Sequence, residues 1–145
     1  MVEVRKITAG ETYEIRLKVL RINSPLSFKF QGDLDRDTFH LGVFENKKLL
    51  AVASFVKSTQ SLLKGSQYQL RGMATLESFQ NLGFGKILLQ EAEVRLRSLN
   101  TEVLWCNARV IAFDFYKKQG FEFFGKIFEI EDVGPHAVMV KKLRK

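Results

Sequence analysis

The sequence predicts a mixed α/β fold, in which helices cover a sheet of parallel and antiparallel strands. Segments that alternate polar and apolar residues are interspersed with segments of helical periodicity. In the first half, two apolar runs flank a short "NKK" turn, which is typical of an antiparallel hairpin. In the second half, the strand–helix–strand order requires at least one parallel pairing. The length of 145 residues suits one domain with its own core, so we expect a single domain over residues 1–145.

The first half of the chain is predicted to hold four strands and one helix. Val2–Ile7 alternates polar and apolar residues and predicts a strand. Thr8 and Glu11 have the spacing of a capping box, so a helix should begin there and run to about Arg21. Asn23–Asp37 contains Pro, Gly and several Asp residues, and we expect an irregular segment near the substrate. The hairpin strands and the strand after them are expected at 39–45, 49–58 and 67–75.

The second half alternates helices and strands. A helix is expected from near Gly83 to about Leu99, because its apolar residues fall on one face. Glu102–Asn107 predicts a strand, and Arg109–Gly120 predicts a helix with glycine as its C-terminal stop. Two closing strands are expected at 121–130 and 136–143. The predicted order is therefore β-α-β-β-β-α-β-α-β-β.

Bulk composition narrows the functional class. The formal net charge is +7, but the Lys and Arg residues are scattered, so we expect no nucleic-acid binding. A polyanionic small ligand, or solubility alone, explains the charge equally well. There is neither a membrane-length apolar run nor a signal-peptide core, so we expect no membrane association. The single cysteine, Cys106, allows no internal disulfide, which favours a cytoplasmic location. Two distant histidines and one cysteine predict no metal site.

The stretch "QNLGFGKILLQ" (Gln80–Gln90) places two glycines directly before a predicted helix. The first turn of a helix leaves backbone N–H groups unpaired at the positive end of the helix dipole, which suits a phosphate. Gly83 and Gly85 would leave room for that anion and permit positive φ. The stretch lacks the third glycine of a GxGxxG fingerprint, and it is not a Walker A loop because Ile87 stands where that motif needs Ser or Thr. Glycine spacing alone leaves two alternatives open, a phosphate site and a plain strand-to-helix turn.

Three features in this order and spacing resemble the GNAT superfamily of acyl-CoA-dependent N-acyltransferases. The first is Gln80-x-x-Gly83-x-Gly85, which follows a strand ending in "RGMATLES". The second is Asn107, and the third is the helix that ends in Tyr116-x-x-x-Gly120-Phe121. The detailed resemblance covers roughly residues 67 to 125, and the order of elements extends it to nearly the whole chain.

The resemblance implies a splayed mixed sheet of six or seven strands with helices on both faces, and acetyl-CoA as cofactor. It implies that the coenzyme A pyrophosphate binds backbone amides in the segment after Gln80, and that the pantetheine arm pairs with the preceding strand as an added strand would. It places Asn107 and Phe115 against the pantetheine. The other cofactor-binding residues implied are Met73, Ala74, Thr75, Gln80, Asn81, Leu82, Gly83, Phe84, Gly85 and Lys86. Lys118 is a further candidate to steer the anionic cofactor.

The chemistry is attack of a neutral amine on a thioester, with a proton returned to the departing thiolate. Tyr116 is the candidate proton donor, since a phenol has a pKa near 10. Two candidates remain open for the general base: Glu77, just past a strand, and His136, at the head of one. His40 is expected to be structural. Cys106 is expected in the core, so we favour direct transfer over a covalent intermediate.

These expectations predict an acetyl-CoA-dependent N-acetyltransferase. Its acceptor would be an amine of a small molecule, peptide or protein, which the sequence does not identify. Arg16 and Arg21 are candidates to bind an acidic group of the acceptor, and Phe28 and Phe30 either line the acceptor pocket or plug the edge of the core. We expect a monomer or a homodimer. The alternatives are a non-catalytic acyl-CoA sensor or scaffold and a basic nucleic-acid-binding module.

Overall fold

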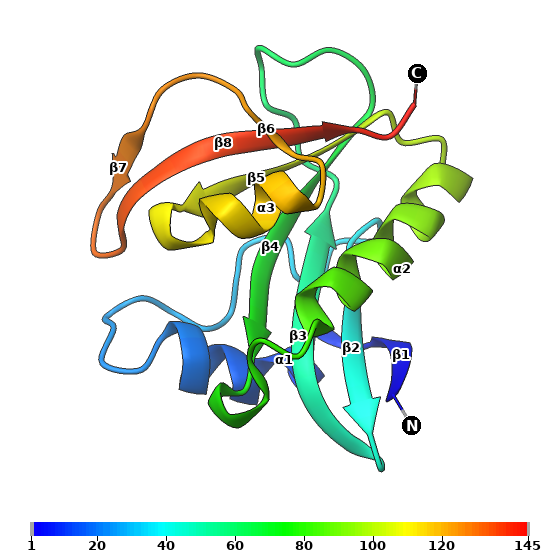
Figure 1. Cartoon of the computed structure of the whole chain (residues 1–145), viewed down its shortest axis with the longest axis vertical. Helices are drawn as coiled ribbons and strands as arrows, with labels where there is room; N and C mark the ends of the chain where they lie inside the picture. Colours follow the sequence, from blue (N-terminus) through cyan, green and yellow to red (C-terminus); the bar gives the residue numbers. More distant parts are fainter. Residues whose placement is uncertain (1, 145) are drawn as a thin grey trace.

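The central feature of the computed structural model, which describes residues 2–144, is one mixed sheet of eight strands (Figure 1). The strand order is β1-β2-β3-β4-β5-β8-β6, with β7 also paired to β8. All neighbours are antiparallel except β4 and β5, which are parallel. The strands are β1 Val2–Ile7, β2 Phe39–Glu45, β3 Lys48–Val56, β4 Gln67–Thr75, β5 Val103–Arg109, β6 Glu122–Phe123, β7 Phe128–Ile130 and β8 Gly134–Lys142.

The sheet splits between β4 and β5. The two strands pair only where Gln67–Gln69 lies beside Val103–Trp105. Beyond that point β4 stays with β3 and β5 stays with β8, so β5 and β8 cross the first four strands at a steep angle (Figure 1). The backbone edges of 70–75 and 106–109 therefore face an opening. The mixed, splayed sheet that the resemblance implied is confirmed.

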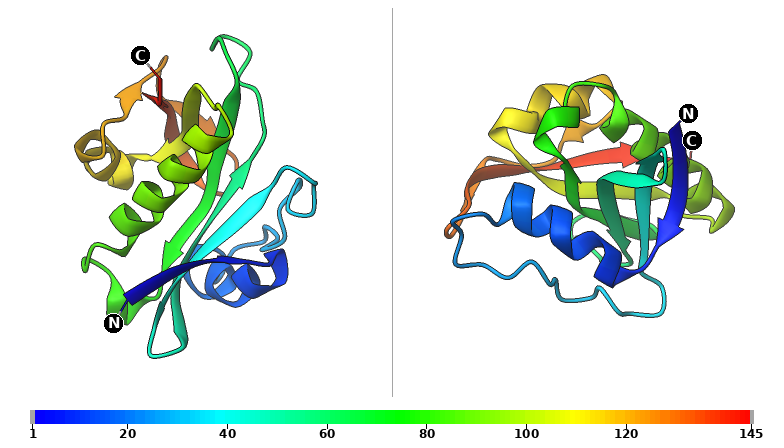
Figure 2. Two further views of the ribbon diagram at one scale, coloured as in Figure 1. Left: turned by 90° about the vertical axis from the view of Figure 1, so that its right-hand side faces the viewer. Right: turned by 90° about the horizontal axis from the view of Figure 1, so that it is seen from below.

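Helices cover both faces of the sheet (Figure 2). Helix α1 (Ala9–Ile15) lies on one face, where Ile15 packs with Ile7, Val52 and Ala74. Helices α2 (Phe84–Ser98) and α3 (Phe113–Lys118) lie on the other face, over the larger core. The capping box that the sequence predicts is present: the Thr8 hydroxyl accepts from the Glu11 backbone N–H, and the Glu11 carboxylate accepts from that of Thr8.

Two helices and the closing segment differ from expectation. The first helix continues as a π-helix, η1 (Arg16–Leu20), and a π-turn of this kind is frequent at functional sites. The helix predicted at 109–120 begins late, because Arg109 still belongs to β5 and Val110–Ala112 forms a 3-10 turn, η3. A second 3-10 turn, η2, spans Glu77–Phe79. The closing segment breaks into β6 and β7 around Gly125, which has φ +90°, and this raises the strand count to eight.

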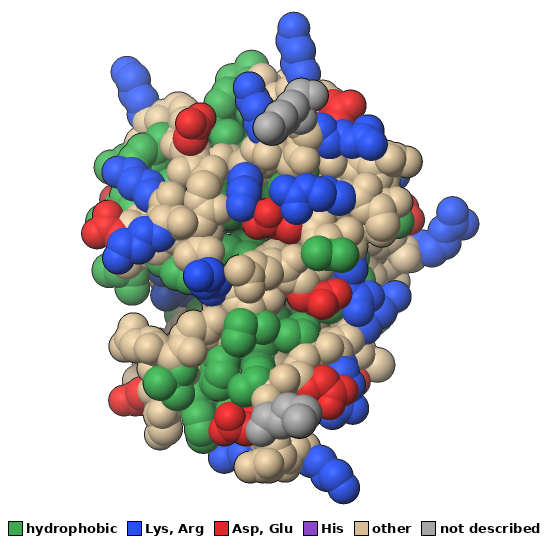
Figure 3. Space-filling model, turned by 45° about the vertical axis from the view of Figure 1, so that its right-hand side comes forward, with side chains coloured by type: hydrophobic (Ala, Val, Ile, Leu, Met, Phe, Trp, Pro, Cys, Tyr) green, Lys and Arg blue, Asp and Glu red, His purple; other side chains and the backbone are tan. Residues whose placement is uncertain are grey.

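Positive charge is dispersed on the face drawn in Figure 3. Lys and Arg side chains are scattered there, and Asp and Glu side chains lie among them, so this face carries no continuous basic stripe (Figure 3). Within residues 2–144, no helix is long and apolar enough to cross a membrane.

Candidate active site

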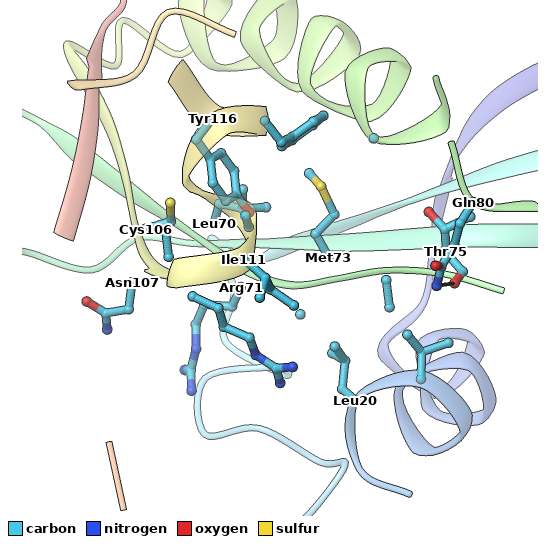
Figure 4. A pocket seen from close by; sticks show the side chains of 18 of the residues that line it. Leu20, Leu70, Arg71, Met73, Thr75, Gln80, Cys106, Asn107, Ile111 and Tyr116 are labelled. Atoms are coloured by element: carbon cyan, nitrogen blue, oxygen red, sulfur yellow. Dashed lines mark hydrogen bonds between the residues drawn. The ribbon is translucent and has the colours of Figure 1, made fainter. Parts of the chain in front are cut away.

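A cleft of about 950 Å³ fills the opening between the two arms of the sheet. One wall is β4 from Gln69 to Thr75, and the other is β5 from Cys106 to Arg109. Further lining comes from the first turn of α2, from α3 and η3, from the end of η1 and the segment after it, and from the segment that joins β7 to β8. In Figure 4, Tyr116, Cys106 and Met73 lie on one side of the cleft, and Asn107 and Leu20 lie on the other. Residues far apart in sequence thus meet around one cavity.

A bulge interrupts β4 at the centre of the cleft. Arg71 pairs with Ser54 and Ala74 with Val52, so two residues, Gly72 and Met73, face the single residue Ala53. Gly72 has φ +59°, and a Cβ atom there would lie 2.7 Å from the Phe30 ring. Sequence analysis missed this bulge. The available signal was an isolated glycine inside a strand pattern.

The N-terminus of α2 opens onto the cleft without a side-chain cap. Gly83 is the N-cap residue, with φ +87°, and no side chain accepts a hydrogen bond from the first turn. Asn81 also has positive φ, at 65°. The Gln80 side-chain amide donates to the Thr75 carbonyl oxygen over 3.0 Å, which ties the loop to the end of β4. The backbone N–H groups of this first turn are therefore directed at the cleft, where an anion can accept from them.

The two glycines serve different physical purposes. A Cβ atom at Gly83 would meet nothing within 4 Å, so the positive φ alone explains this glycine. A Cβ atom at Gly85 would lie 3.0 Å from Cζ of Phe115 and 3.4 Å from Sδ of Met73. We expected both glycines to leave room for an anion, but the free protein gives each glycine a different reason. Gly85 allows α2 to pack closely on two cleft side chains.

Tyr116 extends from α3 into the cleft and is 8% exposed. Its ring packs edge-on against Phe115 and Phe121. Burial, followed by interaction with the adjacent Cys106, raises the pKa of Tyr116 well above its ordinary value, so the phenol keeps its proton. Burial also raises the pKa of Cys106 to about 12, and the hydrogen bond with Tyr116 offsets only part of that rise. A neutral buried thiol is a poor nucleophile, as the sequence indicated.

The two histidines occupy different environments. His136 lines the cleft and is 4% exposed, and its Nδ1 lies 2.7 Å from the Gly134 carbonyl oxygen. Because a carbonyl oxygen only accepts, Nδ1 carries the proton in the neutral ring, and Nε2 is left with a lone pair. His40 is buried in the sheet and contacts Ser54 and the backbone of Asp33, so its predicted structural role agrees with its position.

Comparison with known proteins agrees with this geometry. The sequence model of the Acetyltransferase (GNAT) family matches residues 4–121. An uncharacterized N-acetyltransferase, YitI, from Bacillus subtilis is 40% identical over 99% of this chain and 98% of its own length.

The chain belongs to the GNAT family of acetyltransferases. Solved structures with the same fold include an acyl-CoA N-acyltransferase from Pseudomonas aeruginosa, with a TM-score of 0.80 and 18% identity over 97% of this chain and 99% of that one. They also include the ribosomal-protein-S18-alanine N-acetyltransferase from Escherichia coli, with a TM-score of 0.79 and 18% identity over 100% of this chain and 96% of that one. As a GNAT enzyme the chain is an acyltransferase that uses an acyl-CoA and an amine acceptor.

Most residues predicted for the GNAT site line the cleft, and three do not. Glu77 is exposed on η2, Leu82 is exposed at the tip of the loop, and Lys118 is exposed on α3. None of these three lines the cleft. The predicted residues that do line it are Met73, Ala74, Thr75, Gln80, Asn81, Gly83, Phe84, Gly85, Lys86, Asn107, Phe115, Tyr116 and His136.

Arg16 does not serve the role considered for it. It was a candidate to bind an acidic acceptor, but it is fully buried and its guanidinium pairs with Asp33. The π-helix places Arg16 under the sheet, while Arg21 at the end of that helix lines the cleft. Phe30 also lines the cleft, whereas Phe28 packs against Tyr13. Within residues 2–144, no group of three or more His, Cys, Asp or Glu side chains is placed to hold a metal ion.

Proposed function

We propose that this GNAT enzyme transfers an acetyl group from acetyl-CoA directly to the amine of an acceptor bound in the same cleft. The observation that carries the proposal is the continuity of the cleft. It joins the uncapped N-terminus of α2, the unpaired edges of β4 and β5, and the buried hydroxyl of Tyr116. Each of these three features suits a different part of an acyl-CoA.

The residues present fit coenzyme A. Backbone N–H groups in the first turn of α2, from Gly83 to Lys86, would donate hydrogen bonds to the oxygens of a diphosphate. The positive end of the helix dipole would add a favourable electrostatic interaction. The splayed edges of β4 and β5 offer free peptide groups to an extended, amide-containing arm. Asn107 projects from β5 into the same opening and would bond that arm. Acetyl-CoA, when bound, supplies a thioester whose carbonyl carbon accepts an amine.

Tyr116 would act as the proton donor. It is held in place by Phe115 and Phe121, and its raised pKa keeps the phenol protonated in the free protein, so the hydroxyl is available as a donor. Because the same burial disfavours a thiolate, the departing sulfur would take up that proton readily. Backbone N–H groups freed by the bulge at Gly72 and Met73 would stabilise negative charge on the carbonyl oxygen.

His136 would act as the general base. Its Nε2 has a free lone pair, and the ring lines the cleft where the end of β5 pairs with the start of β8. Glu77 is exposed and does not line the cleft, so we do not assign it a direct role. An amine reaching the cleft as an ammonium would lose one proton to His136 before attack. The nitrogen would lose a second proton as the amide forms, and this proton would replace the one that Tyr116 donates.

The proposal is tested by calorimetry of acetyl-CoA binding, followed by release of free thiol in the presence of a panel of amines. We expect acetyl-CoA to bind and at least one class of amine to release thiol. A protein that does not bind acetyl-CoA would contradict the proposal. A protein that binds acetyl-CoA but acetylates no amine would instead be a non-catalytic acyl-CoA-binding protein.

A further inference from the structure

Three arginines line one end of the cleft and come from three separate elements. Arg21 follows η1, Arg71 lies on β4 beside the bulge, and Arg109 is the last residue of β5. All three side chains are half-buried. Arg21 Nε donates to the Ser27 carbonyl oxygen over 3.0 Å, and Arg71 Nη1 donates to that of Gln31 over 2.8 Å. Arg21 also donates from Nη1 to the Leu20 carbonyl oxygen over 3.2 Å, so its Nη2 group is left for a ligand, and Arg71 keeps Nε and Nη2.

Two of these arginines lie over the ring of Phe30. The guanidinium carbon of Arg21 lies 5.1 Å from the ring centroid, and that of Arg71 lies 5.3 Å from it. Phe30 itself lies over Gly72, where any side chain would displace it. Stacking on an aromatic ring orients a guanidinium while leaving its N–H edges free. Arg21 and Arg71 therefore converge beside the bulge, and Arg109 lines the same cleft from β5.

No carboxylate balances this charge inside the cleft. Among its lining residues within 2–144 are four cationic side chains, Arg21, Arg71, Lys86 and Arg109, and no Asp or Glu. Within the described part of the chain, residues 2–144, no ion pair involves Arg21, Arg71 or Arg109. The carboxylate whose charge acts on Arg71 is Asp33. Both oxygens of Asp33 are already held by Arg16, at 2.7 and 2.9 Å.

Positive charge is crowded around Arg21. Burial, and then repulsion from Arg109, Arg16 and Arg71, lowers the pKa of Arg21. The arginines are separated from Lys86, which lies on the first turn of α2 across the sheet from Phe30 and η1. An anion bound among the arginines would therefore occupy a different place from the one that the end of α2 offers to a diphosphate.

We propose that this end of the cleft binds an anionic group of the acceptor, so that the acceptor is an amine that also carries a carboxylate or a phosphate. This inference depends on the proposed acetyl transfer in one respect, which is that the anionic ligand is called the acceptor. The planar guanidinium group of arginine matches the geometry of carboxylate and phosphate oxygens. It forms charge-assisted hydrogen bonds with either group. The three arginines thus select the acceptor by its charge, while Tyr116 and His136 act on the thioester and the amine.

The test compares amines in matched pairs that differ in one anionic group. The pairs are leucine against leucinamide, β-alanine against propylamine, and phosphoethanolamine against ethanolamine. Binding to the protein saturated with free CoA is measured by calorimetry, and turnover is measured by thiol release from acetyl-CoA. We expect the anionic member of at least one pair to bind about tenfold or more tightly than its neutral partner. The pair that responds distinguishes carboxylate from phosphate.

Substitution of single arginines tests whether they cause the preference for an anionic amine. Arg109→Gln and Arg71→Gln should each reduce the preference within a pair by about tenfold, and the acetyl-CoA dissociation constant should not change. Arg5→Gln is the matched control, because it removes the same charge from an exposed residue of β1. It should change neither the preference within a pair nor acetyl-CoA binding.

Equal binding of charged and neutral partners, or no binding of any anionic amine, would overturn the inference. It would also be overturned if the arginine variants weakened acetyl-CoA binding and left the pairwise preference intact, since the arginines would then serve the cofactor. An anionic preference without thiol release would uphold this inference and contradict the proposed transfer. The two proposals therefore fail separately.

Discussion

Arg16 and Asp33 form a bidentate ion pair in the interior of the protein, with Nη1–Oδ2 and Nη2–Oδ1 distances of 2.7 and 2.9 Å. The side chains of Arg16 and Asp33 are 0% and 4% exposed. Asp33 also accepts from the Phe30 backbone N–H, and Arg16 also donates to Ser54. The pair therefore holds the irregular segment before β2 against the sheet, beneath the arginine end of the cleft.

Asp33→Asn should be strongly destabilising. It leaves the Arg16 charge buried without its partner, and loss of one member of a buried ion pair costs about 3–5 kcal/mol. The free energy of unfolding in urea measures this loss. The control is Asp35→Asn, since Asp35 is exposed two residues away and should change stability little. Equal stability of the two variants would contradict a structural role for the ion pair.

Stability should fall on acidification in two steps. Burial, outweighing the attraction of Asp33, lowers the pKa of His40, so the folded protein keeps this ring neutral. Stability from His40 is complete above its unfolded pKa of about 6.5 and declines as pH falls below that value, because the unfolded chain then binds more protons. Burial alone would raise the pKa of Asp33, but hydrogen bonds from Arg16 and Phe30 and the charge of Arg16 outweigh it. Its contribution has the same sign and is lost at lower pH, below about 4.

The His40→Gln variant isolates the upper step. Glutamine does not titrate, so the unfolding free energy of this variant should vary less with pH between about 6.5 and 5 than that of the wild type. Urea unfolding at a series of pH values measures the difference. An unchanged slope in that range would show that another group is responsible.

Tyr116→Phe should reduce turnover by about 10²- to 10⁴-fold, the range for loss of a positioned proton donor. Acetyl-CoA affinity should persist, because the ring and its packing on Phe115 and Phe121 remain. Thiol release and calorimetry measure the two quantities. Tyr68→Phe removes a hydroxyl that donates to the Asp37 carbonyl oxygen outside the cleft, and its turnover should stay near wild type. Full activity of Tyr116→Phe would exclude the proposed proton donor.

Two glutamine variants distinguish between the candidate bases His136 and Glu77. His136→Gln should lower kcat/KM for the amine by about 10²-fold or more while acetyl-CoA binding remains. Glu77→Gln should leave kcat/KM near wild type, because Glu77 is exposed and does not line the cleft. The opposite pattern would transfer the role of base to Glu77, acting through water.

Gly83→Ala should weaken acetyl-CoA binding. Its new Cβ atom meets nothing in the free protein, but alanine at φ +87° strains the N-cap, at a cost of about 1–2 kcal/mol, and displaces the backbone N–H groups of the first turn. Gly125→Ala is the matched control, since Gly125 has φ +90° and equally open space but does not line the cleft. Both variants should lose similar stability, and only Gly83→Ala should raise the dissociation constant for acetyl-CoA. Equal affinity in both variants would argue against a phosphate site at α2.

Local patterns in the sequence predicted much of the fold. The bounds of β1, β2 and β4 agree with the prediction, and the start of α2 lies within one residue of it. The capping box at Thr8 and the N-terminal loop of α2 depend on contacts between residues a few positions apart, which a sequence displays directly. The order of elements and the two glycines before α2 also led to the family. What sequence missed locally, the bulge at Gly72 and the π-turn at Arg16, depends on packing against Phe30 and Asp33.

The sequence by itself indicated the family and the class of cofactor, and it predicted most of the side chains that line the cleft. Only the tertiary structure decided which charged side chains face the cleft. Arg16 and Arg21 lie on one predicted helix, yet one is buried against Asp33 and the other lines the cavity. Arg21, Arg71 and Arg109 meet because β4 and β5 diverge and the loop carrying Phe30 folds over the bulge. Burial and charge at a site are sums over neighbours distant in sequence, so no local pattern specifies them.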